Sequence, residues 1–257
     1  MSEISLDCHG KVALVTGASG KLGQVIALHL ARAGAKVALH GFSRLEVLKD
    51  ISENLSKEGH TSCLVTGAVD DPRAIAEMKS MIEKELGTVD ILVLNAVSQI
   101  FPWQPVLKEG AERLLDQFHS CALQALHFTQ AFVPQMVENN WGRVIGINTE
   151  CSMQLHPTQG AYATAKRAMD GLLRVLANEI GKDEVTVNQI APGWIDCEET
   201  PDMSEGSKSY IARNSKMGRR ASPEDVANCV TFLATELARS ITGAFIPVSC
   251  GSVTPRI

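Results

Sequence analysis

The sequence has no long hydrophobic run and no cluster of basic residues, and these absences exclude two classes of protein. No apolar stretch approaches the roughly 20 residues that a membrane-spanning helix needs. The first ten residues include acidic residues and no apolar run, which is not the pattern of a secretory signal. The formal net charge of −5 disfavours nucleic acid and anionic membrane surfaces as partners. These features predict a protein that binds a small molecule, not nucleic acid or a membrane.

The chain also lacks closely spaced metal or disulfide ligands. Its seven cysteines are widely separated and form no C-x-x-C pair; they are Cys8, Cys63, Cys121, Cys151, Cys197, Cys229 and Cys250. An odd number of dispersed thiols disfavours a disulfide framework and a zinc site, and the seven histidines do not cluster at ligand spacing. The cysteines therefore indicate reduced thiols in the cytoplasm, and we expect no metal.

Short β-branched runs alternate with longer helical patterns along the whole chain. The predicted strands are Val12–Thr16, Lys36–His40, Ser62–Thr66, Asp90–Leu94, Arg143–Asn148, Val185–Ile190 and Ala244–Val248. The predicted helices are Lys21–Ala33, Arg44–Lys57, Pro72–Leu86, Ala111–Glu138, Ala161–Ile180 and Pro223–Leu237. Repeated βα units with buried strands predict a single α/β domain over residues 1–257, a doubly wound parallel sheet of about seven strands of the Rossmann type.

One segment, residues 195–217, interrupts this alternation with a long polar stretch before the last helix. A loop of this length in a compact domain is typical of a lid over a binding site. A surface insertion with no role in binding is the alternative.

A glycine-rich turn follows the first predicted strand and leads directly into the first helix. Its residues Gly17, Ser19, Gly20, Lys21, Leu22 and Gly23 are predicted to bind a dinucleotide. Such a turn directs backbone N–H groups and the positive end of the helix dipole at one point, which suits a pyrophosphate. A purely structural turn is the alternative.

The residues after the second strand include no acid. A carboxylate there commonly binds the ribose 2′-hydroxyl of NAD, whereas Ser43 and Arg44 occupy the segment here. Both side chains can bind a 2′-phosphate, so the sequence favours NADP, with NAD as the other possibility. Alternatively, Ser43 and Arg44 only cap and flank the next helix.

Tyr162 and Lys166 stand four residues apart at the start of the helix that follows the fifth strand. They share one helix face, so we expect the lysine charge to lower the pKa of the phenol and make it an acid–base catalyst for a carbonyl or alcohol. Thr149 ends the fifth strand and is predicted to orient the substrate oxygen, unless it bonds only to local backbone.

With these motifs in place, the chain resembles the short-chain dehydrogenase/reductase family, and within it the 3-oxoacyl-carrier-protein reductases. The resemblance runs from about Lys11 to Gly251 and includes Thr16-Gly17-Ala18-Ser19, Asn95-Ala96, Tyr162 with Lys166, and Ala191-Pro192-Gly193. It implies hydride transfer between NAD(P)(H) and a ketone or secondary alcohol, with Lys166 also holding the nicotinamide ribose, and a homotetramer. It further implies coenzyme contacts from Val69, Asn95, Pro192, Gly193 and Ile195.

Several positions depart from the family pattern. Thr149 replaces a serine, Cys121 an asparagine, Val97 and Lys21 a glycine each, Ala68 an aspartate and Cys197 a threonine. These changes keep open a second reading, a family member that binds nucleotide as a scaffold or regulator without efficient turnover. A third is dehydration or isomerisation with the same phenol. Lys21 itself, at the start of the helix, is a candidate to bring a charge to the pyrophosphate.

Aromatic residues are scarce, at 5% of the chain, yet several follow the predicted strands near the site. Phe101, Trp103 and Trp194, with Met203 and Tyr210 of the expected lid, are candidates to line an apolar substrate pocket. An apolar ketone or an oxoacyl thioester would suit such a pocket. Packing in the core or between subunits is the alternative for these rings.

Overall fold

The computed structural model describes residues 5–98, 101–195, 209 and 213–253. Most of the segment expected to form a lid, with Cys197, Met203 and Tyr210, lies outside the described residues. One parallel sheet of seven strands runs through the part that is described, in the order β3-β2-β1-β4-β5-β6-β7. The predicted doubly wound α/β fold is therefore confirmed.

The strands coincide with the apolar runs of the sequence within two residues at either end. They are β1 (Val12–Val15), β2 (Lys36–Gly41), β3 (Ser62–Thr66), β4 (Ile91–Leu94), β5 (Gly142–Ile147), β6 (Val185–Pro192) and β7 (Phe245–Val248). β1, β4, β5 and β6 are buried along their whole length. A strand that is covered on both faces needs apolar residues at successive positions, which is why these runs do not alternate with polar residues.

The longer helices connect the strands. They are α1 (Lys21–Arg32), α2 (Leu45–Lys57), α3 (Pro72–Glu85), α4 (Ala111–Phe118), α5 (Gln124–Glu138), α7 (Gly160–Ile180) and α9 (Pro223–Ala234). The short helix α6 (Cys151–Gln154) follows β5. Two of the helix starts are capped by side chains: Asp71 accepts from the N–H of Arg73 before α3, and Ser222 and Asp225 form a capping box at α9.

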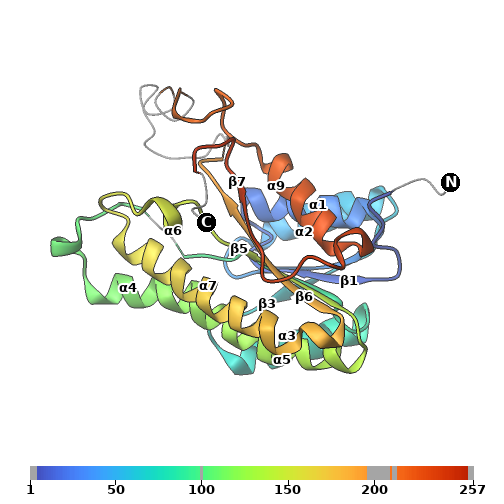
Figure 1. Ribbon diagram of the computed structural model, residues 1–257. Coiled ribbons are helices and arrows are strands. Elements are labelled where there is room, and N and C mark those ends of the chain that lie inside the picture. The colour runs from blue at the N-terminus through green and yellow to red at the C-terminus, as the bar shows by residue number, and fades with distance from the viewer. Residues whose placement is uncertain (1–4, 99–100, 196–208, 210–212, 254–257) are drawn as a thin grey trace.

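The helices form a layer on each side of the sheet, as Figure 1 shows, with α1, α2 and α9 on one face and α3, α5 and α7 on the other. Each layer has its own core. Ile26, Leu30 and Val230 belong to the first, and Phe128, Met169 and Leu173 belong to the second. The sheet between them is a fixed platform for the loops that leave its carboxyl edge.

The predicted helix over 111–138 is not continuous. It consists of α4, a π-helical turn over His119–Leu123, and α5. The extra residue of a π turn shifts the helix face, so Ser120, Cys121 and Ala122 are buried against the rest of the fold. Periodicity alone did not reveal this turn, because the apolar pattern resumes on the other side of it.

In the sheet, β1 pairs with β2 on one side and with β4 on the other. The direction in which successive strands are added to the sheet therefore reverses between β1 and β4. Ligands of open α/β sheets bind at the carboxyl ends of the strands at this point. Among the described residues, no helix is long and apolar enough to cross a membrane, and no group of three or more His, Cys, Asp or Glu residues could hold a metal ion.

Candidate functional site

One cavity of about 720 Å³ lies along the carboxyl edge of the sheet, at the reversal of strand order. Its walls include all of the residues predicted to bind the coenzyme or to act in catalysis. These are Gly17, Ser19, Gly20, Lys21, Leu22, Gly23, Ser43, Arg44, Val69, Asn95, Thr149, Tyr162, Lys166, Pro192, Gly193 and Ile195. The volume suits a small ligand. The fold thus brings together residues that are far apart in the sequence, while their individual roles stay predictions.

The glycine-rich turn needs two of its glycines for its own shape. Gly17 has φ +65°, and a Cβ on it would lie 2.8 Å from the Cα of Ala96. A Cβ on Gly23 would lie 2.3 Å from the carbonyl oxygen of Gly17. Both distances are shorter than any real contact of a Cβ, so the turn packs tightly against β4 and against its own helix. Gly20 precedes α1 and has no side chain to cap the first turn, whose positive end borders the cavity.

Polar side chains hold this turn from below. The Thr16 hydroxyl donates to Oε1 of Gln124 at 2.6 Å and accepts from the backbone N–H of Asn95 at 2.8 Å. The Nδ2 of Asn95 donates back to the carbonyl oxygen of Thr16 at 2.9 Å. Buried polar groups with matched partners fix the relative position of the elements that carry them. Asn95 therefore holds the glycine-rich turn in place in addition to lining the cavity.

His40 is a site residue that the sequence did not reveal. It is buried under the turn, where the N–H of Gly17 donates to its Nδ1 at 3.1 Å and its Nε2 lies 3.0 Å from the carbonyl oxygen of Gly67. Since Nδ1 accepts, the ring proton belongs on Nε2, where it is donated to Gly67. Burial lowers the pKa of His40, which keeps the ring neutral. The only available signal was a histidine in an otherwise apolar strand.

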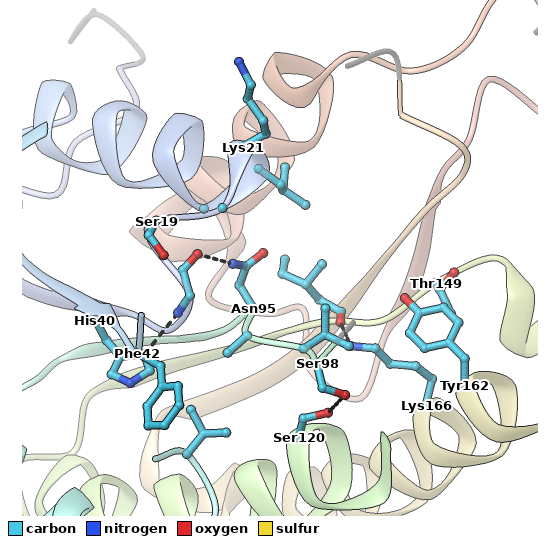
Figure 2. Close-up of a pocket in the computed structure, with 18 of the residues that line it drawn as sticks. Ser19, Lys21, His40, Phe42, Asn95, Ser98, Ser120, Thr149, Tyr162 and Lys166 are labelled. Carbon is cyan, nitrogen blue, oxygen red and sulfur yellow. Dashed lines mark hydrogen bonds between the residues drawn. The ribbon is translucent and has the colours of Figure 1, made fainter. Parts of the chain in front are cut away.

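Phe42, Ser43 and Arg44 line the far end of the cavity, beyond β2. The guanidinium of Arg44 lies near the glycine-rich turn, since a Cβ on Gly20 would be 3.8 Å from its Nη2. Phe42 is 72% exposed beside it and offers a ring surface at the same end. Lys21 also borders the cavity, but in Figure 2 its side chain extends away from Ser19 and Asn95. The arginine is thus better placed than the lysine to meet a phosphate inside the cavity.

Thr149, Tyr162 and Lys166 meet at the opposite end of the cavity (Figure 2). Tyr162 and Lys166 are both on α7, and Thr149 lies two residues beyond β5. The Oγ1 of Thr149 accepts from the backbone N–H of Cys151 at 3.2 Å, and the Thr149 side chain lies beside the Tyr162 hydroxyl (Figure 2). Lys166 is 2% exposed, and its Nζ donates to the carbonyl oxygen of Ile147 at 2.6 Å and lies 5.9 Å from the centre of the Tyr162 ring.

The expectation that Lys166 lowers the pKa of Tyr162 is wrong for this structure. Burial, followed by the neighbouring thiols of Cys151 and Cys121, raises the pKa of Tyr162, and only the side chain of Thr149 lowers it. The physical reason is that the lysine charge is directed at a carbonyl oxygen of β5, while burial and the two thiols disfavour a charged phenolate. The phenol is therefore protonated at neutral pH.

Asn148 connects Thr149 to Lys166, and the sequence alone did not identify it. Its Nδ2 donates to the carbonyl oxygen of Lys166 at 3.0 Å and to Oε1 of Gln189 at 2.8 Å, and its Oδ1 accepts from the N–H of Thr149 at 2.8 Å. It is 2% exposed. One buried amide thus fixes the start of α7 against the end of β5. The signal in the sequence was a polar residue at the end of an apolar strand.

The unusual family positions are now placed. Cys121 is fully buried in the π-helical turn, and Val97 is 43% exposed on the wall of the cavity together with Ala68. The six cysteines of the described residues are free thiols. None of these substitutions closes the cavity or separates Tyr162 from Lys166.

Comparisons with known proteins show the family of the chain. The family model described as Enoyl-(Acyl carrier protein) reductase matches residues 17–253. The chain is 32% identical over 246 residues to the 3-oxoacyl-[acyl-carrier-protein] reductase of Pseudomonas aeruginosa, covering 96% of this chain and 98% of the relative. The reductase of the same name from Escherichia coli K12 gives the same identity and coverage.

Among solved structures, the fold is similar to that of a gluconate 5-dehydrogenase from Burkholderia cenocepacia J2315, which was determined in complex with NADP and tartrate. The TM-score is 0.89 and the sequence identity 21%, with 96% of each chain covered. At this identity the likeness concerns the fold.

Proposed function

Because the chain belongs to the short-chain dehydrogenase/reductase family, we propose that it reduces a ketone to a secondary alcohol with NADPH. The observation that carries the proposal is the shared cavity, in which Tyr162, Lys166 and Thr149 face the glycine-rich turn. A phenol with a raised pKa, a buried ammonium and a hydroxyl together form an acid catalyst, its neighbouring charge and an orienting group.

In this proposal each side chain has a separate task. Thr149 binds the substrate oxygen from a position beside the Tyr162 hydroxyl. Tyr162 donates its proton to that oxygen as the hydride arrives at the carbonyl carbon. Lys166 also binds a ribose hydroxyl of the coenzyme, as the family resemblance implies. A bound nicotinamide coenzyme supplies the hydride.

The cavity fits a dinucleotide with a 2′-phosphate. The turn from Gly17 to Gly23 and the start of α1 would bind the pyrophosphate, and Ser43 and Arg44 would bind the 2′-phosphate. No acidic residue stands at Phe42, Ser43 or Arg44 to receive a free ribose 2′-hydroxyl. The NADP in the gluconate 5-dehydrogenase structure supports the same coenzyme.

The coenzyme is tested by the KM values for NADPH and NADH. We expect a lower KM for NADPH, and a rise of about 10- to 100-fold in Arg44→Ala, since a charge-assisted hydrogen bond contributes about 1.5–3 kcal/mol. The KM for NADH should change little in the same variant. A strong preference of the unaltered protein for NADH refutes this part of the proposal.

The reaction is tested by a screen of NADPH consumption over ketones, in which acetoacetyl thioesters are included because relatives of the chain are 3-oxoacyl reductases. We expect turnover of at least one ketone. Tight NADPH binding without turnover of any ketone favours instead a nucleotide-binding scaffold or regulator. The retained Tyr162 and Lys166, placed in the cavity, count against that alternative.

We also propose a cytoplasmic homotetramer. Helices α4 and α7 pack together and expose the apolar side chains of Leu114, Leu115, Phe118 and Val175, which suits burial against a second copy. The free thiols suit a reducing compartment. The mass in solution, measured by light scattering, tests the assembly, and a monomer at micromolar concentration contradicts it.

A further inference from the structure

A row of four aromatic rings runs outward from the reacting phenol. The Trp103 ring lies 6.0 Å from the Tyr162 ring at 65°, and the Phe101 ring lies 5.2 Å from Trp103 at 86°. The Trp194 ring follows at 6.3 Å from Phe101. We define Phe101, Trp103 and Trp194 as the aromatic wall. Its rings come from the segments after β4 and after β6, which meet at the carboxyl edge of the sheet.

The aromatic wall is not part of either hydrophobic core. Its three residues are half-buried and belong to neither of the two core clusters that flank the sheet. The chain has only seven Phe, three Trp and two Tyr residues, so a third of its aromatic residues stand in this one row with Tyr162.

The Trp194 end of the wall is attached to the loop after β5. The backbone N–H of Trp194 donates to the carboxylate of Glu150, which also accepts from the hydroxyl of Ser252. Glu150 is 2% exposed and directly follows Thr149. The wall is thus tied to the same loop as the catalytic threonine, and a prearranged surface binds a rigid ligand with little loss of entropy.

We propose that the aromatic wall is a binding subsite for a flat aromatic ring, and that the substrate is an aryl ketone. This inference rests on the proposed function, because the carbonyl oxygen must reach Tyr162. A ketone placed in this way has its substituent next to Trp103. Edge-to-face and offset contacts favour another aromatic ring at this position, whereas a saturated ring or an acyl chain lacks the quadrupole that such contacts use.

The test compares acetophenone with cyclohexyl methyl ketone, which differ in whether the six-membered ring is flat and aromatic. Conjugation lowers the intrinsic reactivity of the aryl ketone, so the measured quantity is the change in the ratio of the two kcat/KM values between proteins. We expect Trp103→Leu to lower the acetophenone to cyclohexyl methyl ketone ratio about tenfold, which corresponds to about 1.4 kcal/mol. Trp103→Phe should retain most of the ratio.

Trp141→Leu is the matched control. Trp141 precedes β5 at the opposite edge of the sheet, where Lys11 and Arg143 pack on its ring. This variant should keep the wild-type ratio. A ratio that is unchanged in Trp103→Leu, or that falls equally in Trp141→Leu, overturns the subsite.

A binding measurement separates failure of the subsite from failure of the proposed function. If no ketone is turned over, the proposed reaction fails, and calorimetry with the protein and NADP+ still compares the Kd values of the two ketones. Binding of acetophenone that is about tenfold tighter, and loses this advantage in Trp103→Leu, supports the subsite. Equal Kd values for the two ketones overturn it.

Discussion

Asn148 offers the sharpest perturbation of the catalytic geometry, because its one buried side chain holds both Thr149 and Lys166. Replacement by alanine removes three hydrogen bonds of 2.8–3.0 Å. It also leaves Oε1 of Gln189 and the N–H of Thr149 without these partners in a buried site. At about 1 kcal/mol for each net bond, and more where a buried group is left unpaired, we expect a loss of about 2–4 kcal/mol in the free energy of unfolding.

The effect on catalysis separates positioning from stability. Release of the Thr149 N–H and of the start of α7 permits shifts of the reacting groups, for which losses of up to about 100-fold in kcat are common. We expect Asn148→Ala to lower kcat by tenfold or more, with a small change in the KM for NADPH. Asn148→Asp keeps the oxygen that accepts from the Thr149 N–H, so its kcat should lie between the values for the unaltered protein and for Asn148→Ala.

Asn188 provides the matched control. It is also buried, at 1% exposure, and its side chain bonds to the carbonyl oxygen of Ile241 at 2.6 Å and the N–H of Ala244 at 3.1 Å, away from the cavity. Asn188→Ala should lose similar stability in urea unfolding but keep its kcat at a temperature where it is folded. Equal kcat losses in the two alanine variants would show that general destabilisation, not positioning, explains the effect.

Three further outcomes are expected. Gly23→Ala should abolish coenzyme binding in a fluorescence titration, because its Cβ would lie 2.3 Å from the Gly17 carbonyl oxygen. Gly171→Ala is the control and should bind the coenzyme normally, since there is open space around Gly171. Normal coenzyme binding by Gly23→Ala contradicts the tight turn. Since burial raises the pKa of Tyr162, the phenol stays protonated across about pH 6 to 8. The rate of ketone reduction should therefore be constant in that range, and the rate of alcohol oxidation should rise with pH. A reduction rate that falls between pH 6 and 8 contradicts this expectation. Ser222→Ala should lower the free energy of unfolding by about 1 kcal/mol through loss of the cap on α9, measured by urea unfolding, and an unchanged midpoint would show that the capping box contributes nothing.

Much of the fold was predictable because its signals are local. Apolar runs such as Ile91–Leu94 need burial on both faces. The Ser222-Pro223 pair favours the start of a helix independently of the distant parts of the chain. Glycines after the first strand and the Tyr162/Lys166 spacing are likewise local patterns. Since the carboxyl ends of parallel strands share one edge, these patterns also predicted which residues line the cavity.

The rest depends on contacts between distant segments. The pKa of Tyr162 is set by burial and by Cys121 and Cys151, which only the folded chain brings near the phenol. His40 on β2 accepts a hydrogen bond from the glycine-rich turn that follows the neighbouring strand β1, and Asn148 bonds to Lys166 because α7 packs beside the end of β5. Residue type and spacing along the chain do not predict contacts between distant segments, so the contacts of His40 and Asn148 were identified only from the structure.

The role of Tyr162 as proton donor is tested most directly by Tyr162→Phe, which removes one oxygen atom and keeps the ring. We expect its kcat for ketone reduction to fall by about 10²- to 10⁴-fold, while its Kd for NADPH stays within about twofold of the unaltered protein. Ketone reduction that proceeds in this variant at the original rate would contradict the account.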